Sequence, residues 1–360
     1  MTISTANWKT YEFGDLVSNL TRATKEPLSE GYERYVGLEH IEPGNIFIKS
    51  WGNVAEGTTF TRIFKKGHVL FGKRRAYQKK AALAEFDGVC SGDILVFEAN
   101  QENIMHELLP FIVQSDKLFD YAIKTSAGSL SPRTKFKDLA KLKFKLPTLP
   151  EQKKLSDLLW SIGNGIVCWN HVVNNLEILI QSMVRSDLKQ HDDEKVKISS
   201  VLRKSSEYEV GKIPKSEYCA RGKYPIVDQS KNDIAGYSDK EELVYLGDLP
   251  VLVFGDHTTE IKFVDYPFIL GADGTKVMLP KSHIDPKYLY YVIRDFNLKP
   301  LGYRRHFSML KNSIIKVPGL DVQKTFLAKI NEVVVKKGPL LNQVYKLKNI
   351  QKQIINQIFR

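Results

Sequence analysis

The sequence predicts an α/β protein with two tandem mixed α/β domains, separated by two long antiparallel coiled-coil helices. Two observations predict this architecture. The chain repeats itself, because Pro147 and Gln152 recur 171 residues later as Pro318 and Gln323. After each proline, apolar residues follow a helical period for about ten turns. Self-similarity at so long a period indicates duplicated domains rather than a solenoid.

The repeat sets the expected domain boundaries. A length of 360 residues accommodates two ordinary domains. The first domain is expected at 1–148 and the central helix at 149–190. The second domain is expected at 191–318 and the C-terminal helix at 319–360.

Each domain shows short strand patterns, with β-branched or aromatic residues bounded by glycine and aspartate. Longer apolar patterns of helical period follow the strands in both halves. The expected strands are 34–38, 68–72, 93–99, 224–228, 251–255 and 275–280. The expected helices within the domains are 104–124 and 286–296.

The two long helices carry a heptad pattern, because the steps between apolar residues in the central helix alternate between four and three. Such a seam keeps one narrow stripe facing a partner helix. Thr148 and Glu151 form a capping box at the start of the central helix. The residues expected to pair the helices are Leu155, Leu159, Ile162, Ile166, Trp169, Val173, Leu176, Phe326, Ile330, Val333, Leu340, Val344, Leu347 and Ile354.

The overall charge favours a polyanionic partner. The net charge is +12 and the isoelectric point is about 9.3, which is typical of proteins that bind nucleic acid. The start of the chain lacks a signal-peptide pattern, and the apolar runs are too short for a bilayer. The three cysteines have no metal-ligand spacing. We therefore expect a cytoplasmic protein with no metal site and no membrane contact.

The densest basic tract runs from Arg62 to Lys80, with eight Lys or Arg residues and no acidic one. Arginines in such a tract grip phosphates or read guanine edges. The alternative is a solvated hairpin whose charges only aid solubility. The candidate DNA-binding residues in this tract are Lys73, Arg74, Arg75, Tyr77, Lys79 and Lys80.

Further candidates lie on polar loops, which carry binding residues more often than packing residues. The loops that precede the two long helices contribute Ser129, Arg133 and Lys135, then Arg304, Arg305 and His306. In the second half, the counterpart of the basic tract offers Asp256, His257, Thr258 and Thr259 as readers of base edges. An enzyme that uses Asp256, His257 and Glu260 is a weaker alternative, because the equivalent place in the first half is basic and no catalytic motif is present.

Two stretches resemble the specificity subunits of type I restriction–modification systems. They are LPTLPEQKKLSDLL (146–159), a proline–Glu-Gln helix start, and the strand pattern GHVLFGKRRAYQKKAALAEFDGVCSGDILVF (67–97). Val322 departs from the pattern, since it stands where the first half has Glu151.

The resemblance implies a non-catalytic subunit with two target recognition domains, each gripping one half of a bipartite double-stranded DNA site. The helices would set the spacer between the halves. Two methylation subunits would dock on the helices, and restriction subunits would join for cleavage. S-adenosylmethionine, ATP and Mg are expected on those partners and no cofactor on this chain. A coiled-coil scaffold that binds RNA or a partner protein is the alternative function.

Overall fold

The computed structural model describes residues 7–190, 194–204, 211–271, 274–296, 298 and 305–360. These residues belong to two compact units. Unit 1 contains residues 1–170 and 341–360, and unit 2 contains 171–340. Within the described ranges, none of the helices combines the length and apolar character that crossing a membrane requires.

Unit 1 contains two four-stranded sheets, and strands predicted at 34–38, 68–72 and 93–99 are confirmed as parts of them. The sheet orders are β2-β9-β6-β7 and β4-β3-β8-β5. The strands are β2 (Val17–Leu20), β3 (Arg34–Val36), β4 (Gly52–Asn53), β5 (Arg62–Phe64), β6 (Val69–Gly72), β7 (Ala81–Leu83), β8 (Gly88–Cys90) and β9 (Ile94–Ala99).

The helix predicted over 104–124 is instead two helices, so that expectation is corrected. They are α2 (Leu109–Val113) and α3 (Asp116–Lys124). Ser115 separates them because its backbone is extended, and its side chain accepts a hydrogen bond from the Leu118 N–H. A serine in this position caps the second helix rather than extending the first. The apolar pattern continues through the break and conceals it.

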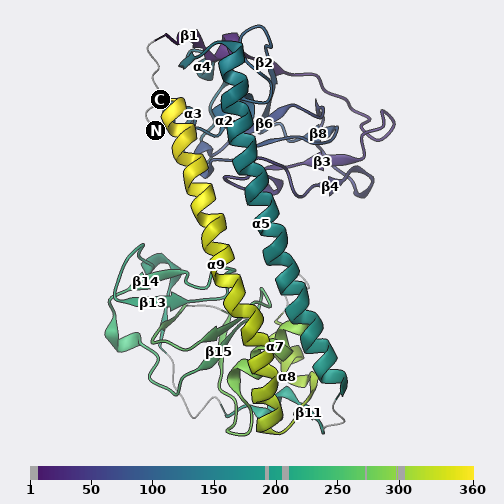
Figure 1. Ribbon diagram of the computed structural model, residues 1–360, viewed down its shortest axis with the longest axis vertical. Coiled ribbons are helices and arrows are strands. Elements are labelled where there is room, and N and C mark those ends of the chain that lie inside the picture. The colour runs from purple at the N-terminus through teal and green to yellow at the C-terminus, as the bar shows by residue number, and fades with distance from the viewer. Residues whose placement is uncertain (1–6, 191–193, 205–210, 272–273, 297, 299–304) are drawn as a thin grey trace. The chain divides into compact units, whose positions relative to one another are not determined.

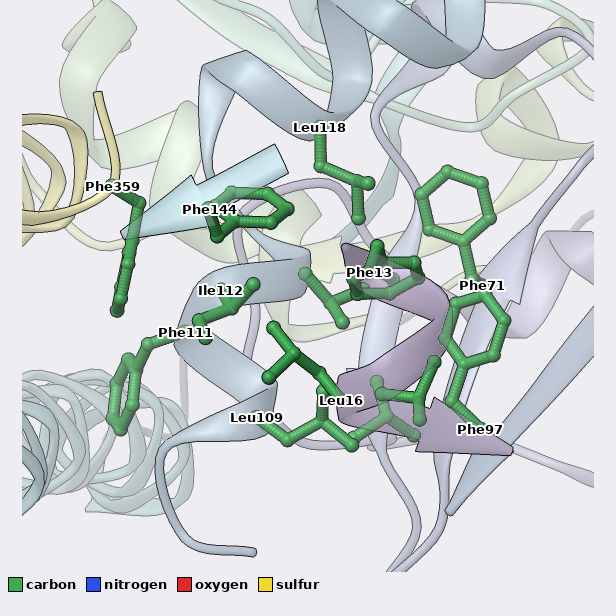
Figure 2. Close-up of a cluster of buried hydrophobic side chains, with 14 of the residues drawn as sticks. Phe13, Leu16, Phe71, Phe97, Leu109, Phe111, Ile112, Leu118, Phe144 and Phe359 are labelled. Carbon is green, nitrogen blue, oxygen red and sulfur yellow. The ribbon is translucent and has the colours of Figure 1, made fainter. Parts of the chain in front are cut away.

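The C-terminal end of the chain is part of the core of unit 1. Strand β1 (Lys9–Glu12) pairs antiparallel with β10 (Lys143–Leu146), and α1 (Phe13–Leu16) and α4 (Phe136–Leu139) lie beside this ribbon. Figure 2 shows the buried cluster around Phe13, with Phe359 beside it. The ring of Phe359 lies 6.5 Å from that of Phe144, between centroids. The last helix therefore completes the core that the first domain begins.

Unit 2 repeats this plan with one sheet of three strands and one of four, and its predicted strands and its helix at 286–296 are confirmed. The sheet orders are β16-β15-β18 and β12-β17-β13-β14, and β11 pairs with β19. The strands are β11 (Lys195–Lys197), β12 (Lys212–Ile213), β13 (Tyr224–Val227), β14 (Gly236–Ser238), β15 (Val251–Gly255), β16 (Ile261–Val264), β17 (Ile269–Gly271), β18 (Thr275–Met278) and β19 (Ile314–Lys316). The helices are α6 (Ile198–Val201), α7 (Pro286–Asp295) and α8 (Phe307–Asn312).

The two long helices are α5 (Leu149–Gln190) and α9 (Leu320–Ile358). In unit 1 the first turns of α5 pack against the last turns of α9, with Leu159 in the same apolar cluster as Ile355. In unit 2 the last turns of α5 pack against the first turns of α9, with Ile180 in one cluster with Ile330. The helices are therefore antiparallel in both units (Figure 1). Every residue predicted to pair them is buried or half-buried.

The duplicated glutamine fixes the start of each long helix to its own domain. The Gln152 side chain accepts a hydrogen bond from the Met105 N–H and donates to the carbonyls of Asn103 and Pro147. Gln323 makes the same three bonds, to Asp285, His283 and Pro318. Both side chains are buried. Each amide thus satisfies buried backbone groups that would otherwise lose their hydrogen bonds.

The helix seam of unit 1 contains one polar contact that unit 2 lacks. The Gln351 amide donates to the Leu159 carbonyl at 3.0 Å. A Cβ at Gly163 would lie 3.3 Å from the same amide nitrogen, so the glycine leaves room for it. At the equivalent position, unit 2 has the apolar residue Ile180. Gly163 therefore fits the helix contact, although glycine alone weakens a helix.

Candidate DNA-recognition loops

The candidate residues of the basic tract begin at Lys73, directly after β6, and backbone hydrogen bonds join them to two other segments. The Lys73 N–H donates to the Asp93 carbonyl, and the Thr134 N–H donates to the Lys73 carbonyl. The Arg75 N–H donates to the Pro132 carbonyl, and Arg75 has a left-handed φ of 52°. The tract and the loop before α4 were predicted as separate candidates. The structure brings them together on one surface.

Asp93 organises the charges of this surface. Its carboxylate accepts hydrogen bonds from Arg133 Nε at 2.8 Å and from Arg74 Nη1 at 3.3 Å. The hydroxyl of Ser131 accepts from Arg74 and Arg75. Burial opposes ionisation of Asp93, but the two arginines outweigh it and hold the pKa of its carboxyl below the ordinary value. One carboxylate thus orients two guanidinium groups and leaves the surface net positive.

Lys73 lies inside this positive surface. Burial, with the neighbouring charges of Arg62 and Arg133, lowers the pKa of its ammonium group, although Asp93 opposes the shift. The clustered cations therefore repel one another in the free protein. Such a cluster is a candidate contact for the phosphates of a nucleic acid, and that contact stays a prediction.

The remaining candidates of unit 1 fall into two groups: side chains that are exposed, and lysines that already bond within the protein. Tyr77, Ser129 and Lys135 are exposed. Lys79 forms an ion pair with Asp116 at 2.5 Å. Lys80 donates to the Leu38 carbonyl at 2.6 Å. The fold thus uses the ammonium groups of Lys79 and Lys80 locally, whereas the exposed three face solvent.

Unit 2 builds the same backbone arrangement where β15 ends. The Asp256 N–H donates to the Gly274 carbonyl, and the His306 N–H donates to the Asp256 carbonyl. Asp256 therefore stands where unit 1 has Lys73. Its buried carboxylate accepts the Phe307 N–H at 2.8 Å, so it fixes the loop before α8. Arg305 from this loop is exposed, and Arg304 lies outside the described residues.

The other candidates of unit 2 are held by backbone carbonyls. The Thr258 hydroxyl donates to the Gln229 carbonyl, and the Thr259 hydroxyl donates to the Leu298 carbonyl, both at 2.6 Å. The Gln229 side chain accepts the His257 N–H. The His306 ring is buried, with Nδ1 2.9 Å from the Asp256 carbonyl. The fold therefore orders these side chains tightly, and their contact with bases stays a prediction.

Sequence reasoning missed Asp93 as an organiser and missed the clamping role of Gln152 and Gln323. Asp93 lies 19 residues from Arg74 and 40 from Arg133, so no local pattern joins them. The glutamines did align between the halves, and their recurrence was the available signal.

Comparison with known proteins identifies the first half of the chain. The family described as "Type I restriction modification DNA specificity domain" matches residues 5–177. Residues 5–177, just under half of the chain, are therefore similar to the DNA specificity domain of type I restriction–modification systems. The matched specificity domain includes the whole basic tract, the Asp93 cluster and the first turns of α5.

Relatives and solved structures agree with this family. The Type I restriction enzyme EcoDI specificity subunit of Escherichia coli is 28% identical over 158 residues, which are 41% of this chain and 33% of that protein. The alignment therefore spans about a third of that relative. The S subunit of a type I restriction–modification system from M. genitalium has a TM-score of 0.52 at 12% identity, covering 100% of this chain and 98% of that one.

A second solved structure comes from work on complex assembly and conformational transition of the type I R-M system. It has a TM-score of 0.50 at 18% identity and covers 99% of this chain and 98% of that one. At such identities the two structures show the fold alone. That fold is a duplicated pair of mixed α/β domains with long helices, as the repeat predicted.

Proposed function

We propose that this chain is the non-catalytic DNA-specificity subunit of a type I restriction–modification complex. Each domain reads one half of a bipartite double-stranded site. The observation that carries the proposal is the shared scaffold with different contact side chains. Lys73 in unit 1 and Asp256 in unit 2 occupy equivalent backbone positions, and equivalent backbone hydrogen bonds hold each of them. Two such domains suit two different short sequences, because base contacts specify sequence while the scaffold only positions them.

The long helices are proposed to hold the two readers at a set separation. Helices α5 and α9 have 42 and 39 residues. At about 1.5 Å per residue each is about 60 Å long, a little under two turns of B-DNA at about 34 Å per turn. Such a span leaves an unread spacer between the half-sites. The heptad seam supplies the stiffness that this role needs.

The helices also offer surface for protein partners. Tyr345 and Ile350 in unit 1, and Ile178 and Val335 in unit 2, are large apolar side chains exposed on α5 or α9. These side chains are the candidate contacts for a protein partner. We assign them to two methylation subunits, which would bind S-adenosylmethionine. Restriction subunits, with ATP and Mg, would complete the complex.

A competition experiment tests DNA reading. The full chain is assembled with its methylation subunit, and the target is identified by mapping methylated sites in cells that express both. Binding of a labelled target duplex is then competed by the same duplex, a scrambled duplex and an RNA duplex at equal salt. The target should compete at least about 10³-fold better than the scrambled DNA. Equal competition by all three contradicts the reading function and favours the scaffold alternative.

A further inference from the structure

Unit 2 contains a hollow lined by cations beside its recognition loop. The cavity has a volume of about 450 Å³ and lies between the segment after α6, strand β18 and the start of α8. No acidic side chain is found among its lining residues in the described part of the chain. The cationic lining residues are Arg203, Lys204, Lys212, Lys276 and Lys311.

Residues that line the hollow, or lie next to its lining, also bond to Asp256 in the candidate recognition loop after β15. Thr275 lines the hollow and directly follows Gly274, whose carbonyl accepts the Asp256 N–H. Phe307 also lines it, and its N–H donates to the Asp256 carboxylate. The Lys311 ammonium group lies 5.2 Å from the centre of the Phe307 ring. A ligand in the hollow therefore lies next to whatever the loop contacts.

The first unit shows that the fold does not require these charges. Phe254 pairs with Lys276 in unit 2 as Phe71 pairs with Leu95 in unit 1. The Ile198 N–H donates to Ser313 as the Phe13 N–H donates to Leu142, which aligns the starts of both units. On this alignment, Arg203, Lys204, Lys276 and Lys311 correspond to Ser18, Asn19, Leu95 and Ala140.

None of the four counterparts is charged. Unit 1 nevertheless pairs β6 with β9 and β1 with β10, as unit 2 pairs β15 with β18 and β11 with β19. Gathering cations in one cavity costs electrostatic free energy that a neutral set avoids. Three of the four are lysines, whose compact charges suit a phosphate and carry no planar hydrogen-bond pattern for reading bases. Arg203 already pairs with Asp248 at 2.7 Å, and Lys212 donates to the Thr275 carbonyl, so it is Lys276 and Lys311 that indicate a ligand. Their charges, which the fold of unit 1 does without, point to an anion and not to folding.

We infer that this hollow binds a backbone phosphate of the DNA that unit 2 reads. The inference rests on the proposed function and deepens it, because it assigns unit 2 a phosphate anchor that unit 1 lacks at the equivalent place. Phosphate contacts set position and affinity but carry no sequence information. The anchor fixes the register of unit 2 on the duplex, while the loop after β15 selects the bases.

The test measures how DNA affinity depends on salt. Lys276→Gln combined with Lys311→Gln removes two positive charges from the hollow. Lys223→Gln combined with Lys240→Gln removes the same charge from exposed lysines of unit 2 that pair with exposed Glu241 and Glu217. All variants are assembled with the methylation subunit. Affinity for the mapped target duplex is measured by fluorescence anisotropy between 0.1 and 1 M KCl.

The plot of log affinity against log salt has a negative slope. Loss of one phosphate contact in the hollow variant should make that slope less steep by about 1. Relative to wild type, the hollow variant should therefore lose about tenfold more affinity at 0.1 M KCl than at 1 M KCl. The mapped target sequence should stay the same. Lys276→Arg with Lys311→Arg should restore the slope, which shows that charge and not folding was lost. An unchanged slope, or an equal change in the control, overturns the inference.

Two further arms separate the ligand source and the underlying function. Calorimetric titration of the DNA-free complex with ATP and with inorganic phosphate tests for a soluble ligand. Binding that the hollow variant loses would overturn the DNA assignment in favour of a free phosphate compound. If wild type instead prefers the target no more than scrambled duplex, the reading function itself fails, whatever the slopes show.

Discussion

In unit 1, strand β6 leads into Lys73, Arg74 and Arg75, and the Asp93 carboxylate binds Arg74 together with Arg133 from the loop before α4. In unit 2, strand β15 leads into Asp256, His257 and Thr258. The side chains of Asp256 and Thr258 bond to neighbouring backbone, and the His257 N–H donates to the Gln229 side chain. The backbone bonds that hold the two loops are equivalent. The difference teaches that the scaffold and the contact surface of this protein are separable. Interior residues that recur preserve the frame, while the loop side chains are free to differ.

The largest expected effect concerns the packing of the long helices α5 and α9. Leu159→Lys and Ile330→Lys place a charge at fully buried, equivalent positions of the helix seam. Each should lower the free energy of unfolding by about 3–5 kcal/mol, because a buried unpaired charge is strongly destabilising. Urea unfolding measures the loss. Leu158→Lys, at the exposed neighbouring leucine, is the control and should stay within about 0.5 kcal/mol of wild type.

The duplicated glutamine clamps give the next largest effect. Gln152→Leu and Gln323→Leu each remove three hydrogen bonds and leave buried backbone groups unsatisfied. We expect a loss of about 2–4 kcal/mol in each case, measured by urea unfolding. The exposed Gln181→Leu is the control. A loss in one unit and none in the other would show that the clamps are not equivalent and would break the comparison.

Asp93 in unit 1 should make the stability of the protein depend on pH. Its pKa is lowered in the folded protein, so its stabilising contribution is complete above the unfolded pKa of about 3.9 and disappears as pH falls through the lower folded value. Asp93→Asn should cost about 1 kcal/mol at pH 7, since the ion pairs are partly exposed. Thermal unfolding should show this difference from pH 7 to 5 and its decline below pH 4. A difference that persists unchanged at pH 2 refutes the role assigned to the carboxylate.

The smallest effect sharpens the contrast between the two seams. Gly163→Ala should be unfavourable in the wild-type chain, because the new Cβ meets the Gln351 amide at 3.3 Å. In a Gln351→Ala background the same change should stabilise α5 by up to about 1 kcal/mol through helix propensity. A double-mutant cycle measures the coupling. Additive effects would show that the glycine and the glutamine are independent.

Much of the frame was predictable from sequence because it depends on periodicity and on repetition. The heptad positions from Leu155 to Ile354 are buried or half-buried, and the six expected strands formed. The break at Ser115 was not visible, since apolar spacing alone does not show where a serine caps a new helix. Repetition of Gln152 and Gln323 was visible, but their bonding partners lie on a distant loop.

The contact surface was less predictable, since it depends on which strands become neighbours. The basic tract and Arg133 were proposed as separate candidates, and only the pairing of β6 with β9 brings Asp93 between them. Lys276 and Lys311 occupy a strand and a short helix that look unremarkable as sequence. Their common cavity exists only after β15 pairs with β18.

Replacing residues 1–148 with the recognition domain of another specificity subunit tests the central claim most directly. The chimaera is expressed with its methylation subunit, and methylated sites are mapped across the genome. Two independent readers on one frame predict that one half of the recognised sequence changes while the other half and the spacer are kept. If both halves change together, or neither does, the two domains do not read DNA separately and the account is contradicted.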